Sequence, residues 1–160
     1  MLNKLNPLRL FAGHSDKHDE PVEQVSPKAD PLFPSKEELH AFIREGASQL
    51  GGSEKMFLKH LNKFITNYAQ SHEEVERLFK GHEYEEAHRL AHSIKGLAGT
   101  LSLYELQEAA KTLEGYLKPF VAAPPSEADL AQVYEDLAPL LSSYAHQLCR
   151  VCSNGPIELD

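Results

Sequence analysis

His92 and Lys95 are the two residues whose types and spacing suggest a reaction. In a helix, residues three positions apart lie one turn from each other, so their side chains can meet. An exposed histidine has a pKa of about 6.5, so much of it is neutral near pH 7, and a neutral ring nitrogen is a nucleophile. Phosphoryl transfer requires mainly positioning and charge neutralisation, which a neighbouring lysine can supply. The pair is therefore suited to carrying a phosphoryl group.

The segment from Tyr84 to Thr100 is predicted to be an amphipathic helix that exposes these residues. At about 100° per residue, its apolar side chains cluster within roughly 60° of Ile94, which defines the core side. His92 falls at about 160° on the same helical wheel. The solvent face is predicted to hold His92 together with His88, Lys95, Gly96 and Gly99.

Two glycines in this helix, Gly96 and Gly99, are unfavourable for its stability. Each costs roughly 1 kcal/mol relative to alanine in a helix interior. The missing side chains would let a bulky partner approach the imidazole of His92. We therefore predict that both glycines, with His88 beside them, face a docking partner. Accidental surface glycines are the alternative.

Residues 91–100 read AHSIKGLAGT and resemble the phosphohistidine motif of histidine phosphotransfer domains, including those of chemotaxis-type kinases. The resemblance covers roughly residues 50–116 and includes further positions on both sides of the motif: Gly81, Ala87, Leu90, Leu106, Ala110, Leu113 and Glu114. Two positions depart from the family pattern. His82 stands where an acidic residue is common, and Ser102 where a glycine is common. Both are turn or cap positions, so the departures concern local geometry.

This resemblance implies a phosphoryl carrier in multistep His–Asp relays, built on a four-helix bundle with the phosphorylated histidine exposed in mid-helix. Carried over to this sequence, it implies that His92 is the phosphoacceptor and Lys95 its electrostatic partner. Gly96 and Gly99 become the positions that give a partner clearance. The implied partners are receiver domains of response regulators or hybrid histidine kinases.

Helical periodicity predicts helices over residues 35–50, 53–79, 84–100, 103–117 and 126–148. Serine–glutamate capping boxes are expected at Ser35 and Ser71, and Gly81 is expected to end a helix in the left-handed conformation. Short turns between amphipathic helices predict an all-α fold, an antiparallel four-helix bundle with an additional N-terminal helix. Around this bundle, residues 35–150, we expect a flexible leader over residues 1–34 and a tail over residues 151–160.

Antiparallel packing also predicts which residues of the 103–117 helix approach the site. Lys111 and His92 each lie about nine residues from the turn near residues 101–102, so the two should be level. Gln107, Glu108 and Lys111 are therefore candidates for a second layer around His92. For each of them, an ordinary solvated helix face is the alternative.

Composition and missing motifs limit the partners and cofactors. The formal net charge of −8, with acids and bases interspersed, argues against a nucleic-acid surface, and we predict no membrane insertion. There is no glycine-rich ATP loop, so phosphoryl must arrive and leave in trans, and whether the chain counts as an enzyme stays open. We expect no cofactor or metal of its own, since Mg²⁺ would belong to the partner receiver domain. The presence of only two cysteines favours a cytoplasmic location.

Other interpretations compete with the phosphoryl carrier. The pairs at 37–40 and 85–88 have the Glu-x-x-His spacing of di-iron bundles, although their wheel positions point to solvent. Cys149 and Cys152 have the spacing of a redox or metal half-site, with helix-end packing as the simpler interpretation. A helical interaction bundle without phosphotransfer is the remaining alternative. The proline-rich start is compatible with a free-standing protein and with a fragment of a hybrid kinase.

Overall fold

The computed structural model describes residues 30–153 and 155–158, so residues 1–29 of the predicted leader lie outside the described part. The described residues contain no strand and six helices: α2 (Lys36–Gln49), α3 (Glu54–Tyr68), α4 (Ser71–Lys80), α5 (Tyr84–Thr100), α6 (Tyr104–Ala122) and α7 (Leu130–Cys152). The predicted all-α class is confirmed. In the described ranges, no helix combines the length and the apolar character that crossing a membrane requires.

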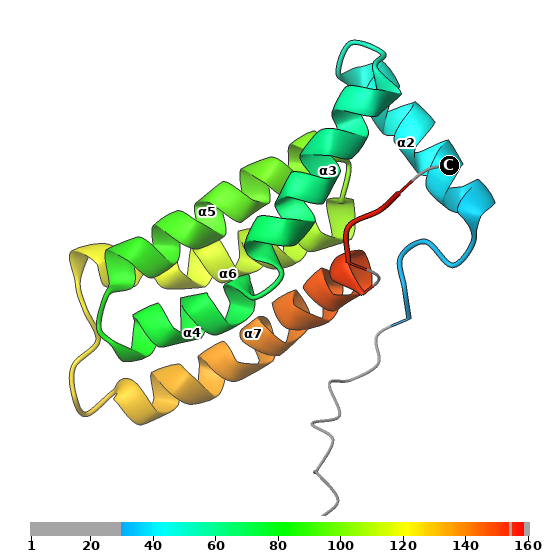
Figure 1. Ribbon diagram of the computed structural model, residues 1–160. Coiled ribbons are helices and arrows are strands. Elements are labelled where there is room, and N and C mark those ends of the chain that lie inside the picture. Colours follow the sequence, from blue (N-terminus) through cyan, green and yellow to red (C-terminus); the bar gives the residue numbers. More distant parts are fainter. Residues whose placement is uncertain (1–29, 154, 159–160) are drawn as a thin grey trace, which may run out of the picture.

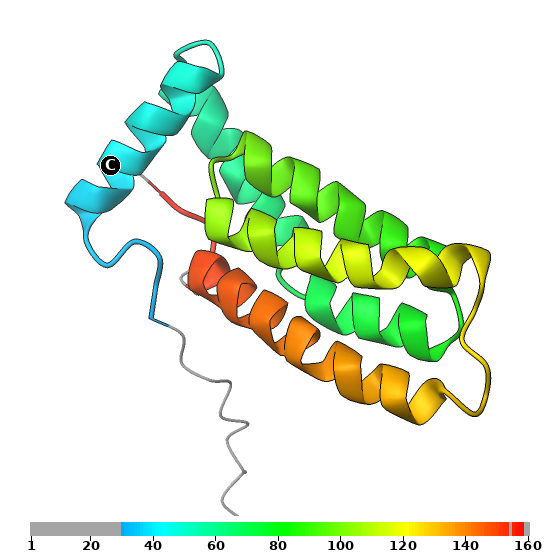
Figure 2. The ribbon, with the colours of Figure 1, turned by 180° about the vertical axis from the view of Figure 1, so that it is seen from behind.

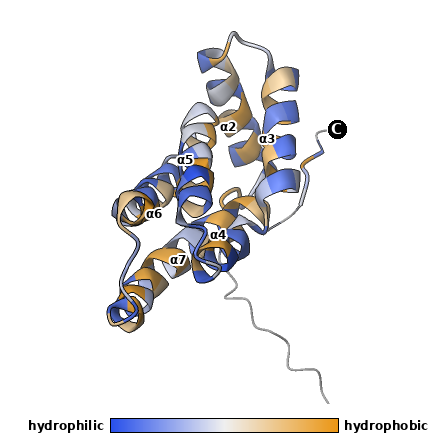
Figure 3. Ribbon diagram, turned by 90° about the vertical axis from the view of Figure 1, so that its left-hand side faces the viewer, coloured by the Kyte–Doolittle hydropathy of each residue, from blue (hydrophilic) through white to orange (hydrophobic). Residues whose placement is uncertain are grey.

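Helices α4, α5, α6 and α7 form an antiparallel bundle, and α2 and α3 form a hairpin at one end of it (Figure 1, and from behind in Figure 2). Hydrophobic and hydrophilic residues both occur along each bundle helix, as amphipathic helices require (Figure 3). The predicted bundle with an N-terminal addition is thus confirmed, but the addition contains two helices. The helix expected over residues 53–79 is divided between α3 and α4.

The most extensive helix pairing in the bundle is between α5 and α6. Small side chains explain it, because α5 buries Ala87, Ala91 and Ala98 and α6 buries Ala110, which lets the two backbones approach closely. Larger residues then fill the space on either side of this contact: Ile94, Leu106, Leu113 and Leu117 are all fully buried or nearly so. The close approach brings polar side chains at the edge of the α5–α6 interface within reach of one another.

Helix α4 begins at Ser71, but not by the predicted capping box. Ser71 is buried, and its hydroxyl lies 2.5 Å from the hydroxyl of Tyr144 on α7, so it cannot cap its own helix. The N-cap is Gln70, which makes no side-chain capping bond. At Ser35 half of the expected box is present, since its Oγ accepts from the amide of Glu38 at 3.2 Å, whereas the Glu38 carboxylate accepts from the Ser35 hydroxyl at 3.1 Å and not from the Ser35 amide.

Both turns that flank α5 contain a residue in the left-handed conformation. In the turn before α5 it is His82, with φ of 62°, whereas Gly81 has φ of −83°, so the predicted role of Gly81 is wrong. In the turn after α5 it is Ser102, with φ of 60°. These are the two positions that depart from the family pattern. Left-handed backbone is costly for residues other than glycine, so both turns are strained.

Segments outside the bundle tie its end together. The amide of Leu32 donates to the carbonyl of Arg150 at 3.0 Å, which fixes the chain before α2 against α7. The side-chain amide of Asn62 on α3 brackets Ile157, with bonds of 2.7 Å to its carbonyl and 2.6 Å from its amide. The α2–α3 hairpin is therefore attached to the rest of the molecule by the segment before α2 and by the segment after α7.

Cys149 and Cys152 lie in the last turn of α7, as free, half-buried thiols. Cys152 packs against the core, and its burial together with the neighbouring Cys149 raises the pKa of its thiol to about 11. A thiol held neutral in this way is unreactive, which fits helix-end packing.

Candidate functional site

The site lies in the middle of α5, on the side of the helix turned away from its buried alanines. Ala91 and Ile94 are fully buried, whereas the side chain of His92 is 61% exposed. The predicted exposure of His92 therefore agrees with the structure. The Nδ1 edge of the imidazole contacts α6, and more than half of the side chain remains open to a partner.

The centre of the site is a carboxylate, Glu114 on α6, that contacts three residues of α5. Its Oε1 lies 2.7 Å from Nδ1 of His92, and its Oε2 lies 2.6 Å from Nζ of Lys95. Nε2 of His88 lies 3.9 Å from the same Oε1. Residues 88, 92 and 95 follow one another at helical spacing, so they form a stripe along α5 that faces Glu114.

Glu114 stays ionised in this setting. Its side chain is only 14% exposed, and that burial alone would raise its pKa. Hydrogen bonds from Lys95 and His92, and the charges of both, outweigh burial and hold the pKa of Glu114 below its usual value. A fixed negative charge therefore lies directly behind the imidazole of His92.

This carboxylate determines which ring nitrogen of His92 is available. A carboxylate accepts hydrogen bonds, so a neutral imidazole beside it carries its proton on Nδ1. The other nitrogen, Nε2, is then unprotonated and has a free lone pair. The hydrogen bond also fixes the orientation of the ring, since the partner of one ring nitrogen determines the state of the other. The geometry thus provides an exposed, oriented nitrogen nucleophile.

Lys95 and His88 are arranged differently from the sequence-based expectation. The Lys95 side chain is half-buried, and its Nζ pairs with Glu114 rather than standing free beside the imidazole. His88 was expected on a partner-facing surface, but its side chain is 23% exposed and its Nε2 is buried. His88 therefore belongs to the inner edge of the site, against α6, and not to an open docking face.

The two glycines of α5 also differ from one another. A Cβ added at Gly96 would meet nothing within 4 Å, which agrees with the predicted clearance. A Cβ added at Gly99 would overlap the side-chain amide of Gln107 and lie 3.1 Å from its Cδ. The expectation that Gly99 is open to a partner is therefore wrong. The space beside Gly99 is instead filled by the Gln107 side chain of α6.

The predicted second-layer residues are dispersed. Gln107 lies against Gly99, about two turns along α5 from His92. Glu108 lines a hollow together with Leu140 of α7, so it lies on the flank of α6 that faces away from His92. Lys111 is exposed, and its expected position level with His92 is taken by Glu114.

Side-chain tilt explains why residue counting missed Glu114 as a partner of His92. Helical side chains point toward the N-terminus of their own helix. In an antiparallel pair, the side chain of His92 therefore leans away from the α5–α6 turn, and that of an α6 residue leans toward it. The α6 partner must come from one turn further along the chain than equal counting predicts, at Glu114 rather than Lys111. A carboxylate at the edge of the apolar stripe of α6 was the available signal.

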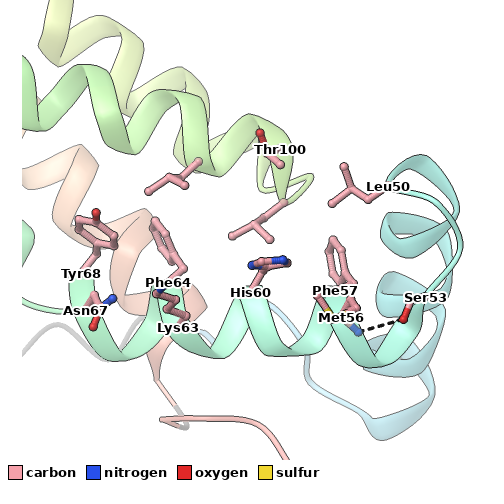
Figure 4. A pocket seen from close by; sticks show the side chains of 12 residues that line it. Leu50, Ser53, Met56, Phe57, His60, Lys63, Phe64, Asn67, Tyr68 and Thr100 are labelled. Carbon is pink, nitrogen blue, oxygen red and sulfur yellow. Dashed lines mark hydrogen bonds between the residues drawn. The ribbon is translucent and has the colours of Figure 1, made fainter.

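The flank of α5 opposite α6 borders an apolar groove of about 620 Å³. Phe57, Phe64 and Tyr68 line it from α3, and Figure 4 shows these rings pointing across it toward α5. Leu97 and Thr100 of α5 and Leu101, the residue after it, line the other side. Three large hydrophobic residues at the groove are unusually exposed: Leu50, Met56 and Leu97.

The charges at this groove have one sign. Its lining includes Lys63 and His60 but no aspartate or glutamate, although the whole chain has a net charge of −8. Within the part of the chain that the structure describes, no cluster of three or more histidine, cysteine, aspartate or glutamate side chains is arranged to hold a metal ion.

Comparison with known proteins identifies the family. No curated protein and no solved structure shows significant similarity to the chain. The Hpt domain family matches residues 59–143, which is more than half of the chain and includes the whole of α4, α5 and α6. Domains of this family act in histidine phosphotransfer within phosphorelays, and their general partners are receiver domains. The chain, with its exposed histidine in the middle of a bundle helix, belongs to the Hpt domain family.

Proposed function

We propose that this chain carries a phosphoryl group on Nε2 of His92, accepting it from and returning it to aspartates of receiver domains. The observation that carries the proposal is the 2.7 Å contact between Nδ1 of His92 and the largely buried Glu114. It leaves Nε2 as the free, solvent-facing nitrogen of an oriented ring.

The transfer step follows from this arrangement. Nε2 attacks the phosphorus of an aspartyl phosphate, a P–N bond forms as the P–O bond breaks, and the receiver's aspartate leaves as a carboxylate. The ring keeps its proton on Nδ1 and becomes positively charged, and the carboxylate of Glu114 stabilises that charge. Return of the phosphoryl group reverses each step. We expect the Mg²⁺ of the reaction to be held by the receiver, with this chain contributing no metal ligand.

Lys95 serves this step in two ways. Its ammonium group holds the second oxygen of Glu114 at 2.6 Å, which keeps the carboxylate aimed at His92. Its positive charge also lies within one helical turn of the transferring group, whose oxygens are negatively charged. Removal of Lys95 should therefore slow transfer without removing the acceptor.

The docking surface of the receiver is inferred from what lies next to His92. Gly96 provides open surface one turn further along α5, and Leu97 leads from there into the apolar groove. An occupant of that groove needs an apolar helix face, and the Lys63 and His60 side chains favour acidic residues at its edge. We infer that a receiver places such a helix in the groove while its aspartate faces His92.

Incubation of the full chain with a phosphorylated receiver tests the function. We expect intact-mass measurement to show one acid-labile phosphoryl group on the wild type and none on His92→Gln. His40→Gln, at an exposed histidine of α2, is the matched control and should label like the wild type. Labelling of His92→Gln, or no labelling of the wild type, would contradict the assignment. Thermal melting of His92→Gln should be nearly unchanged, because the side chain lies outside the core.

A further inference from the structure

His88 is the part of the site that the proposed transfer step does not use. It precedes His92 by one turn, and the two rings are stacked, with centroids 6.4 Å apart and planes inclined by 20°. Its Nε2 is buried and has no hydrogen-bond partner, since the nearest acceptor, Oε1 of Glu114, is 3.9 Å away. A buried polar nitrogen without a partner is unfavourable. The arrangement therefore suits a second state of the site, in which His88 is paired.

Phosphorylation of His92 changes the charge beside that nitrogen. Before transfer, the negative charge of Glu114 is matched by the ammonium group of Lys95 at 2.6 Å. A phosphoryl group adds between one and two negative charges near pH 7, by analogy with other phosphorylated side chains. When the phosphoryl group carries two negative charges, the positive charge of the His92 ring balances only one of them. The site then has an excess of negative charge next to His88.

We propose that His88 takes up a proton from solvent when His92 becomes phosphorylated, and that the protonated ring then pairs with Oε1 of Glu114. This inference rests on the proposed phosphotransfer at His92. The protonated His88 balances the added charge and takes no part in making or breaking the P–N bond. His88 is thus a positioning residue, and its 23% exposed side chain is accessible to solvent protons.

The other charged groups around His88 leave Glu114 as the available partner. On its own helix, Glu85 is held by Arg89 at 2.8 Å. On α6, Lys118 follows Glu114 by one turn and is exposed, so it adds positive charge at a distance. On α4, Glu74 and Arg77 pair with each other at 2.7 Å, beside Leu90, which lies about 200° around α5 from His88.

Linkage gives the sign of the pH dependence. If phosphorylation favours the protonated form of His88, protonation equally favours the phosphorylated protein, and this gain is lost as the pH rises. Side chains one helical turn apart lie roughly 6 Å from each other, and at that separation one unit of excess negative charge raises the protonation equilibrium of a histidine by about threefold even at the dielectric constant of water. We therefore expect the equilibrium between receiver and His92 to favour His92 at pH 6 over pH 8 by about threefold or more.

Two measurements on the full chain test the proposal. The first follows the imidazole NMR signal of His88 from pH 5.5 to 8.5, before and after phosphorylation with phosphoramidate. We expect the His88 signal to titrate at a higher pH after phosphorylation. The signal of His40 on α2 serves as the internal reference and should not move.

The second measurement is the phosphoryl equilibrium with a receiver at pH 6, 7 and 8. Any part of the pH dependence that belongs to the receiver is common to all variants. We expect the additional threefold preference for low pH in the wild type and in His40→Gln, and its loss in His88→Gln. His88→Lys, which keeps a charge at all these pH values, should favour the phosphorylated form throughout.

The outcomes separate the two proposals. Failure of the wild type to become phosphorylated would overturn the proposed function and this inference with it. Phosphorylation with an unchanged His88 titration, or an equal pH dependence in His88→Gln, would overturn only the role of His88. A shifted titration that disappears in Glu114→Gln would support the pairing with that carboxylate.

Discussion

The two flanks of α5 carry opposite kinds of surface. Toward α6, the flank is polar and closely packed, with Nδ1 of His92 and Nζ of Lys95 both held by Glu114. Toward α3, it is apolar and open, and Leu97 borders a groove of about 620 Å³. One helix can therefore separate chemistry from binding, because its two edges face different neighbours. Substitutions on the polar flank should therefore alter the rate of transfer, and substitutions on the apolar flank should alter the affinity for a receiver.

The largest effect should come from the polar flank. Glu114→Ala removes the partner that orients His92 and stabilises the positive ring, so we expect transfer from a phosphorylated receiver to slow by about ten- to hundredfold. Rapid-quench measurements at saturating receiver would give this rate. Glu108→Ala, at an exposed glutamate on the other side of α6, is the matched control and should transfer normally. An equal slowing in both variants would remove the special role of Glu114.

A smaller effect is expected on the apolar flank. Leu97→Ser shortens a side chain that is 37% exposed at the groove, and loss of part of its burial against a partner should weaken receiver binding by about three- to tenfold. The rate at saturating receiver should stay close to that of the wild type. Titration calorimetry would measure the affinity for the receiver. Val121→Ser, at a residue near the end of α6 that is 39% exposed, is the matched control and should bind like the wild type. A slower saturated rate in Leu97→Ser would mean that the flanks are not separable.

The two glycines of α5 differ in the space beside them, which is open at Gly96 and filled by the Gln107 side chain at Gly99. Gly96→Leu should raise stability by up to about 1 kcal/mol and slow transfer, because the new side chain improves helix propensity but stands before the imidazole. Gly99→Leu should show little or no gain, since it must displace Gln107. Thermal melts and transfer rates of both variants would be compared. Equal stabilisation at the two positions would contradict the different surroundings of these glycines.

The smallest effect should come from the turn that joins the polar flank to α6. Ser102 has φ of 60°, and its Oγ is buried without a hydrogen-bond partner. Ser102→Gly should therefore raise the free energy of unfolding by up to about 1 kcal/mol. Ser102→Ala removes the hydroxyl but keeps the backbone strain, so it should gain less. Denaturant unfolding measures both, and a faster or slower transfer in either variant would show that this turn also sets the register of α5 against α6.

Several features of the fold and site were predictable because they depend on local pattern. The apolar repeat of α5 placed Ile94 inside and His92 outside, and the structure agrees. The start of α2 directly after Ser35 followed from the N-capping signature of that residue, whose side chain accepts from the amide of Glu38. Such features depend on the period of the helix and on contacts within one turn, and a short stretch of sequence determines both.

Tertiary structure alone decided which side chains meet between helices. The partner of His92 is Glu114 rather than Lys111 because side chains of antiparallel helices lean in opposite directions, which shifts the contact by one turn. For the same reason Gly99 is covered by Gln107, while Gly96 on the same helix is open. Periodicity places a residue on a face, but it does not state how close the neighbouring helix lies or at what level. That distance follows from the buried alanines of α5 and α6, whose small size brings Glu114 within 2.7 Å of the imidazole.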